Sequence, residues 1–166
     1  MAIELLNRLV MFGALFLAQV LILNHVHLFD VATPLLYVYY VITFRRGFPK
    51  WIMLVSSFVL GLIVDVFSST PGLAAGSLTL VALLQPYILE RLVPRDSADD
   101  LKTSAKTLSY GKFSFLSAVI TAIYCLVFFT LEAFSFFDWL VWMERILASI
   151  VLTWILLMAI ETVRSK

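Results

Sequence analysis

Long apolar runs, separated by short polar stretches, fill most of this sequence. A helix that crosses a membrane needs roughly 17–25 mostly apolar residues. The pattern predicts six such helices in a single integral-membrane domain over 1–166, at 5–23, 31–44, 51–67, 73–92, 113–131 and 139–163. The run 31–44 is short, so by length alone it also fits a re-entrant segment. The expected fold is an all-α membrane protein, a bundle of six transmembrane helices.

Composition supports a membrane protein. Of the 166 residues, 62% are hydrophobic and 14% are charged. Soluble domains average about 45–50% apolar and about 25% charged residues. The formal net charge of +1 gives no reason to expect a nucleic-acid partner. Glu4 interrupts the basic region that a cleaved signal would need, so the first helix is expected to stay as an anchor.

The cationic residues decide the topology. If all six runs cross, eleven of the twelve Lys and Arg residues lie on one side of the membrane, and Arg145 is the exception. Because cytoplasmic loops carry the excess of Lys and Arg, both termini are then cytoplasmic. A re-entrant run 31–44 would instead turn Arg45, Arg46 and Lys50 outward, so we expect this run to cross.

A carboxylate interrupts the apolar run before the turn at 68–72. Ser57, Gly61, Asp65 and Ser68 fall on one stripe of the predicted helix, and Pro71 and Gly72 follow in the turn. Small residues let helices in lipid approach closely. This stripe therefore either holds the bundle together or meets the helix of a partner. Asp65 itself is expected to be shallow and partly wet, with a packing or assembly role rather than a catalytic one.

Arg145 is the leading candidate to pair with Asp65, because it is the only cation expected on the outer side. A second possibility is that residues 136–145 lie flat at the membrane surface. The aromatic residues around them are typical of an interfacial belt, and Arg145 would then simply reach the headgroups.

Catalytic and metal-binding patterns are missing from the sequence. His25 and His27 have Asp30 nearby but no evident third and fourth ligand for a metal. Cys125 is the only cysteine, which leaves no internal disulfide or cysteine-based metal site. Glu161 and the other glutamates near run ends are expected to be solvated. We therefore expect no enzyme activity, no cofactor and no metal, and the mixed charges of 93–112 predict a solvated cytoplasmic loop with a short helix over 98–108.

Four stretches in order carry a family resemblance. They read Asn-His-Val-His-Leu-Phe at 24–29, Ala-Thr-Pro-Leu-Leu-Tyr-Val-Tyr at 32–39, Gly-Leu-Ile-Val-Asp-Val-Phe-Ser-Ser-Thr-Pro-Gly at 61–72 and Pro-Arg-Asp at 94–96. Together they resemble the rod shape-determining protein MreD family, in its Bacteroidetes-type form. The resemblance covers nearly the whole chain in length and segment order, and the hairpin 61–72 is its most recognisable part.

The resemblance implies a role beyond what the residues alone indicate. MreD-like proteins are non-enzymatic inner-membrane components of the cell-elongation machinery, which organises the cell wall and sets cell shape. They act with the periplasmic scaffold MreC, the actin-like MreB, and the RodA glycosyltransferase with its transpeptidase partner. Their six-helix arrangement is similar to that of the S subunits of energy-coupling-factor transporters.

Two functional hypotheses follow from these patterns. In the first, the face with Gly61 and Asp65, together with the outer hairpin, binds the transmembrane helix of an MreC-like partner. In the second, the chain is a vitamin-like S subunit that binds a small molecule, with Ala14 and Ala18 as the small residues that meet a coupling protein. Export of a lipid-linked wall precursor fits less well, because Arg145 is the only candidate cation for its pyrophosphate.

Overall fold

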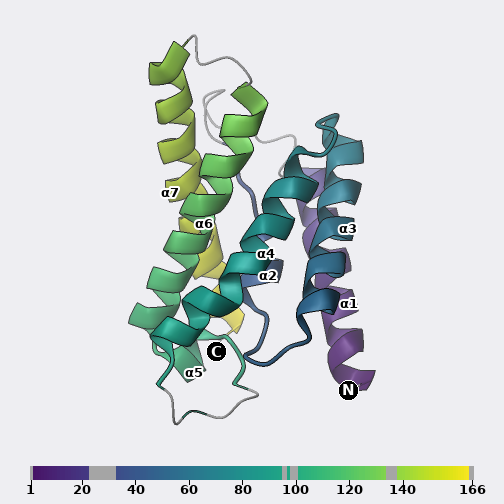
Figure 1. The fold of residues 1–166 in the computed structure, drawn as a ribbon, viewed down its shortest axis with the longest axis vertical. Coiled ribbons are helices and arrows are strands. Elements are labelled where there is room, and N and C mark those ends of the chain that lie inside the picture. Colours follow the sequence, from purple (N-terminus) through teal and green to yellow (C-terminus); the bar gives the residue numbers. More distant parts are fainter. Residues whose placement is uncertain (1, 23–32, 95–96, 98–100, 134–137, 165–166) are drawn as a thin grey trace.

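The structure is a computed structural model that describes residues 2–22, 33–94, 97, 101–133 and 138–164. Within these ranges the chain is all-α and contains no strand, which confirms the all-α part of the predicted fold (Figure 1). The elements in chain order are α1 (Ala2–Leu17), the π-helical turn η1 (Ala18–Ile22), α2 (Val38–Ile42), α3 (Lys50–Ser68), α4 (Leu73–Leu92), α5 (Ala105–Leu108), α6 (Tyr110–Ala133) and α7 (Trp139–Arg164).

Four of these helices, α3, α4, α6 and α7, are long and apolar enough to cross a membrane. Their apolar composition all round, with outward-facing leucine, isoleucine and valine side chains, is what a helix in contact with lipid needs. The chain is therefore a multi-pass membrane protein. The helix at 6–22 is apolar but shorter.

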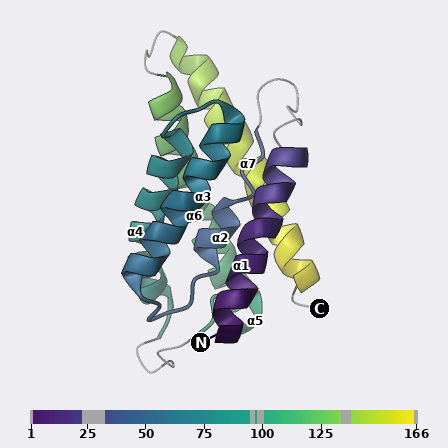
Figure 2. The same cartoon turned by 90° about the vertical axis from the view of Figure 1, so that its right-hand side faces the viewer.

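The bundle has two chemically different ends. Both labelled termini, the turn at 45–49 and α5 lie at one end, whereas the turn at 69–72 between α3 and α4 lies at the other (Figures 1 and 2). The first end is called the cation-rich end below, because the segments there contain nine of the described Lys and Arg residues. They are Arg8, Arg45, Arg46, Lys50, Arg91, Lys102, Lys106, Lys112 and Arg164. The opposite end is called the hairpin end.

The segment 31–44 is not the transmembrane helix that its apolar pattern predicted. Only Val38–Ile42 is α-helical, and the residues before it, from 33, run without regular helix. Every residue from 34 to 44 is buried. The segment descends through the middle of the bundle from the hairpin end toward the cation-rich end (Figure 2). Because protein rather than lipid surrounds it, its backbone can bond to side chains of neighbouring helices instead of forming a helix of its own.

Gln19 supplies those bonds at the hairpin end. Its Nε2 donates to the carbonyl oxygen of Pro34 at 3.0 Å, and its Oε1 accepts from the backbone N–H of Leu36 at 3.0 Å. Gln19 is 1% exposed. A buried amide that bonds at both ends in this way avoids the cost of an unpaired polar group, and it fixes the entry of the segment into the bundle.

Three side chains hold the other end of the segment. The carbonyl oxygen of Phe44 accepts from Gln85 Nε2 at 3.2 Å and from Thr103 Oγ1 at 2.6 Å. Arg8 Nη2 donates to the carbonyl oxygen of Thr43 at 3.2 Å. These donors come from α4, from the stretch before α5 and from α1, so the segment ties together parts of the chain that are distant in sequence.

Thr153→Val provides a test of this bonding. Leu35 N donates to Thr153 Oγ1 at 3.1 Å inside the bundle. The nearly isosteric valine would leave that N–H without an acceptor, which costs about 1–3 kcal/mol. Thr130→Val is the control, because the Thr130 hydroxyl bonds only to the Leu126 carbonyl of its own helix. In reversible unfolding in mixed micelles, we expect Thr153→Val to lower the free energy of unfolding and Thr130→Val to leave it unchanged. Equal stability of the two variants would contradict the bonding described.

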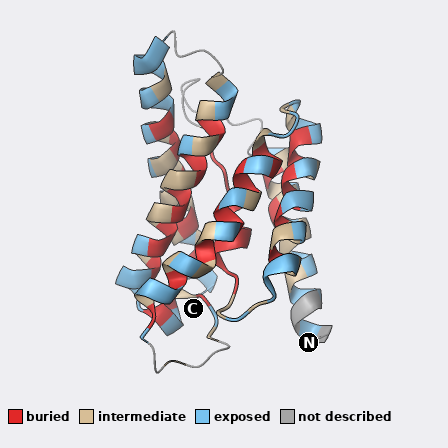
Figure 3. Ribbon diagram, viewed as in Figure 1, coloured by how far each residue is buried: buried red, intermediate tan, exposed pale blue. Residues whose placement is uncertain are grey.

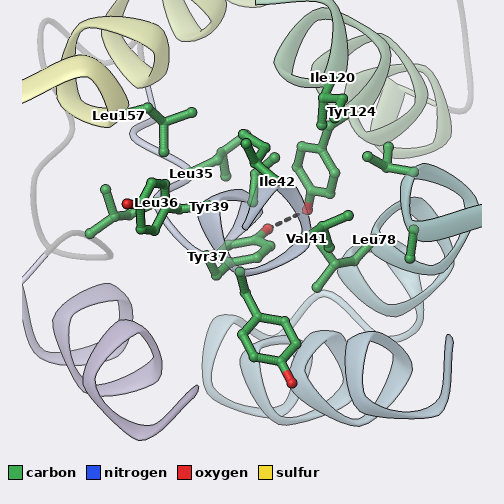
Figure 4. Close-up of a cluster of buried hydrophobic side chains, with 14 of the residues drawn as sticks. Leu35, Leu36, Tyr37, Tyr39, Val41, Ile42, Leu78, Ile120, Tyr124 and Leu157 are labelled. Carbon is green, nitrogen blue, oxygen red and sulfur yellow. Dashed lines mark hydrogen bonds between the residues drawn. The ribbon is translucent and has the colours of Figure 1, made fainter. Parts of the chain in front are cut away.

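The core is assembled around this central segment. Buried positions line the inward faces of the helices, while exposed positions face outward (Figure 3). Tyr37 and Tyr124 share a hydrogen bond between their hydroxyls, and their rings are T-shaped with centroids 5.6 Å apart (Figure 4). Leu78 and Leu157 pack into the same cluster from α4 and α7. Residues 35–44 thus contribute much of the core.

The polar stretch after α4 is less helical than expected. Within the described residues, the predicted helix over 98–108 is reduced to α5, whose capping box is formed by Ser104 and Thr107. The capping box predicted from Ser97 and Asp100 falls partly outside the described residues. Pro86 lies inside α4 without ending it.

Candidate functional site at the hairpin end

Asp65 lies on the last turn of α3, near the end of the helix as expected, but it is 2% exposed, so the expectation of a partly wet carboxylate is wrong. Its Oδ1 accepts from Ala74 N at 2.8 Å and from Thr70 Oγ1 at 3.0 Å, and its Oδ2 accepts from Ala75 N at 2.9 Å. The first N–H groups of a helix have no partner within the helix, and they carry the positive end of its dipole. Asp65 thus caps α4 from the preceding helix, because the N-cap residue Gly72 has no side chain to do so.

The turn between the two helices is tight and requires unusual backbone angles. Ser69 has φ of 57° and Gly72 has φ of 83°, both in the left-handed region that glycine tolerates best. The backbone N–H groups of Ser69 and Thr70 both donate to the carbonyl oxygen of Asp65. Asp65 therefore ends α3 with its backbone and begins α4 with its side chain.

Gly61 lies one helical turn before Asp65, at a tight contact between α3 and the backbone of α4. A Cβ atom at Gly61 would lie 2.4 Å from Ala75 Cα and 2.6 Å from Ala75 N. No larger side chain fits there without moving the backbone of α4. This close approach brings the first turn of α4 within reach of the Asp65 carboxylate.

The predicted partner-facing stripe is therefore occupied by the chain itself. Ser57, Gly61 and Asp65 are all buried, and Ser68 is half-buried. The Ser57 hydroxyl has no hydrogen-bond partner among the described residues, which fits a residue selected for small size. Of the two expectations for this stripe, the burial favours packing within the bundle over contact with the helix of a partner. Of the predicted site residues in the hairpin, Pro71 and Gly72 remain exposed.

Arg145 does not meet Asp65 in the described structure, because both Asp65 carboxylate oxygens bond to the hairpin and α4. Arg145 is exposed on α7 and lines a hollow of about 260 Å³ with Glu132 and Asp138. α7 is one continuous helix from Trp139. Residues 139–145 therefore form its first turns rather than a separate surface segment, and 136–137 lie outside the described residues.

A larger cavity of about 470 Å³ opens at the hairpin end. This volume lies within the range of about 300–1,000 Å³ that is usual for small-molecule pockets. Its lining mixes aromatic and aliphatic side chains with six polar residues drawn from η1, the central segment, α3, the hairpin and α6. These six are Gln19, Thr33, Tyr37, Ser68, Thr70 and Glu132.

Glu161 is another residue whose environment the sequence did not reveal. It was expected to be solvated at the end of α7, but it is 1% exposed. Its Oε2 accepts from Tyr39 Oη at 2.5 Å, and its Oε1 accepts from Ala105 N at 2.7 Å. The only sequence signal for a buried hydrogen-bonding residue of this kind is a polar residue within an apolar run, as at Glu161, Gln19 and Gln85.

The arrangement supports binding and structural roles. Among the described residues, no group of three or more His, Cys, Asp or Glu side chains could hold a metal ion. His25, His27 and Asp30 lie outside the described part of the chain, and Cys125 is a buried free thiol. Comparisons with protein-family models, curated proteins and solved structures find no match for this chain.

Proposed function

We propose that this chain is a non-enzymatic inner-membrane component of the bacterial cell-elongation machinery that binds an MreC-like partner. In this role it helps to position peptidoglycan synthesis and to regulate cell shape. The observation that carries the proposal is the hairpin 61–72, the strongest part of the family resemblance. There Gly61 allows the tight contact with α4, Asp65 accepts from the first N–H groups of α4, and Gly72 adopts a positive φ. Few other residues satisfy these three requirements. The residues that carry the resemblance are thus the ones that shape this hairpin, which is what supports the proposal.

The arrangement of the two ends supports a six-crossing topology similar to that of energy-coupling-factor S subunits. The central segment 33–44 serves as the second crossing, although little of it is helical. With that crossing included, the cation-rich end holds both termini, and the positive-inside rule assigns this end to the cytoplasm. The hairpin end then faces the periplasm, where an MreC-like scaffold would extend. MreB-like, RodA-like and transpeptidase partners enter the proposal through the same family resemblance.

The partner helix needs a face that the bundle does not use itself. On α1, Ala14 is exposed, and a Cβ at the neighbouring Gly13 would meet nothing within 4 Å. Val10 and Leu17 flank them and are also exposed. Small residues between larger apolar ones allow close approach of a second helix in lipid. We therefore place the transmembrane helix of the MreC-like partner along this face of α1.

Ala14→Leu tests this placement. The larger side chain should keep the partner helix at a distance and reduce recovery of the MreC-like protein by about tenfold, since lost packing of one to two kcal/mol has that effect. Ala159→Leu is the matched control, because Ala159 is exposed on α7. The measurement is quantitative co-purification from native membranes with each variant at equal abundance.

Two results would count against the proposal at different levels. Equal recovery with both variants would reject the α1 face but leave the function in place. Failure of the unsubstituted chain to recover any MreC-like protein would reject the function itself.

The second candidate function is that of a small-molecule-binding S subunit, and the hairpin-end cavity is the observation in its favour. Its volume and its convergent polar lining suit a ligand. In this case a small molecule should remain bound through purification in detergent. Extraction of the purified protein followed by mass spectrometry would detect it, and a variant with Thr70→Val should retain less.

A further inference from the structure

A second cavity lies at the cation-rich end and has a volume of about 320 Å³. We call it the basic pocket, because five cationic residues line it. They come from α1, the end of the central segment, the α5 region and α7, and they are Arg8, Arg45, Lys102, Lys106 and Arg164. Tertiary packing assembles this set, since no single stretch of the chain contains more than two of its members.

The one carboxylate in the lining does not offset this charge by pairing with the lysines. Glu161 uses its Oε2 for Tyr39 and its Oε1 for Ala105 N. It is 1% exposed and acts as a fixed acceptor within the wall. With this carboxylate counted, the lining carries five positive charges against one negative charge, so the pocket presents an excess of positive charge to any molecule that enters.

Contacts with neighbouring aromatic side chains position two of the arginines in the basic pocket. The guanidinium of Arg8 lies over the Phe44 ring at 4.2 Å from its centroid. Arg164 Nη1 donates to Tyr39 Oη at 3.2 Å. A guanidinium has five N–H donors in a rigid fork that matches the oxygens of a phosphate. Orienting such groups before a ligand arrives lowers the entropy that binding would otherwise cost.

We propose that the basic pocket binds the phosphate group of an anionic phospholipid from the membrane leaflet at the cation-rich end. Basic pockets between transmembrane helices on the cytoplasmic side are suited to such headgroups. Exposed apolar side chains on the two helices that contribute Asn7 and Arg164 to the lining favour a lipid over a soluble phosphate ester. Leu6 is next to Asn7 and is 63% exposed, and Val163 is next to Arg164 and is 77% exposed. Acyl chains can lie along these two helices while the headgroup enters between them.

This site is independent of the proposed role in cell elongation and of the hairpin-end cavity. It requires only that the cation-rich end lies at a membrane surface. The mixed charge of the loop 93–112 had given no reason to expect strong binding of anionic lipid. Arg8 and Arg164, contributed by α1 and α7, change that expectation.

Lys102→Gln with Lys106→Gln tests the site, because both side chains are exposed at the pocket and removing them should leave the fold intact. Lys50→Gln with Lys112→Gln is the matched control, with the same charge change at the same end but outside the pocket. Native mass spectrometry of the full chain in detergent would measure binding of phosphatidylglycerol, phosphatidylcholine and glycerol 3-phosphate. We expect the pocket variant to bind phosphatidylglycerol at least about tenfold more weakly, and the control to change little.

Phosphatidylglycerol and glycerol 3-phosphate separate a lipid from a soluble source of the phosphate, and phosphatidylcholine, which has no net charge, tests whether an anionic headgroup is needed. Selective loss of phosphatidylglycerol binding, with little glycerol 3-phosphate bound, supports a lipid site. Selective loss of glycerol 3-phosphate binding supports the same phosphate chemistry with a soluble source. Equal losses in the two variants would overturn the proposal in favour of general surface attraction, and unchanged binding in the pocket variant would overturn it as well. Arg164→Gln provides a second variant that should weaken binding in the same way.

Discussion

Gly61→Ala should lower the free energy of unfolding by about 2–3 kcal/mol, the upper part of the range for overpacked sites. The added Cβ would lie 2.4 Å from Ala75 Cα, which is backbone and cannot rotate away. To accommodate it, α4 must move off α3, and this movement also lengthens the bonds from Ala74 and Ala75 to Asp65. One methyl group is thus expected to weaken both the helix contact and the cap. Reversible unfolding in mixed micelles would measure the loss.

Gly76→Ala and Gly13→Ala are the matched controls. Both glycines lie inside helices, and a Cβ at either one meets nothing within 4 Å. Alanine is favoured over glycine inside a helix by up to about 1 kcal/mol, so both variants should be as stable as the unsubstituted chain or slightly more stable. If Gly61→Ala behaved like these controls, the close approach of α3 and α4 would be incorrect. If Gly61→Ala left the fold intact but removed the partner, the face would meet that partner after all.

Asp65→Ala should also cost about 3 kcal/mol, because it removes the acceptor of two buried backbone N–H groups and one hydroxyl. Asp65→Asn should cost less, since one amide oxygen can still accept from Ala74 while the amide nitrogen opposes Ala75 N. Glu144→Ala is the control, because Glu144 is an exposed carboxylate within α7. Thermal unfolding of the purified variants would rank them, with Asp65→Ala least stable and Glu144→Ala little changed.

The same series distinguishes the cap from an ion pair with Arg145. If Asp65 acts as a cap, Arg145→Ala should not change stability, and its effect should add to that of Asp65→Ala. If the two residues were paired, each single variant would lose a similar amount, and the double variant would lose little more. That second result would contradict the role of Asp65 described above.

The sequence by itself determined the features that depend on local pattern. Apolar runs long enough to cross a membrane predicted the four long helices, including α4 over Leu73–Leu92. Thr-Pro-Gly at 70–72 predicted the tight turn between α3 and α4, because these residues break a helix and tolerate unusual backbone angles. The segments in which the sequence groups its Lys and Arg residues lie together at the cation-rich end (Figure 1).

Only the tertiary structure decided what surrounds each apolar segment and which groups each buried charged side chain bonds to. The run 31–44 looks like a short helix, but its residues 34–44 are buried within the bundle, so Gln19, Thr153 and Gln85 can replace helical hydrogen bonds. The Asp65 carboxylate bonds to the first turn of the next helix, and Glu161 bonds across 56 residues to Ala105 N. Apolar periodicity indicates only that the side chain at a position is shielded from water. Whether lipid, a neighbouring helix or a backbone amide takes the place of that water depends on which segments meet, and this is decided when the whole chain packs.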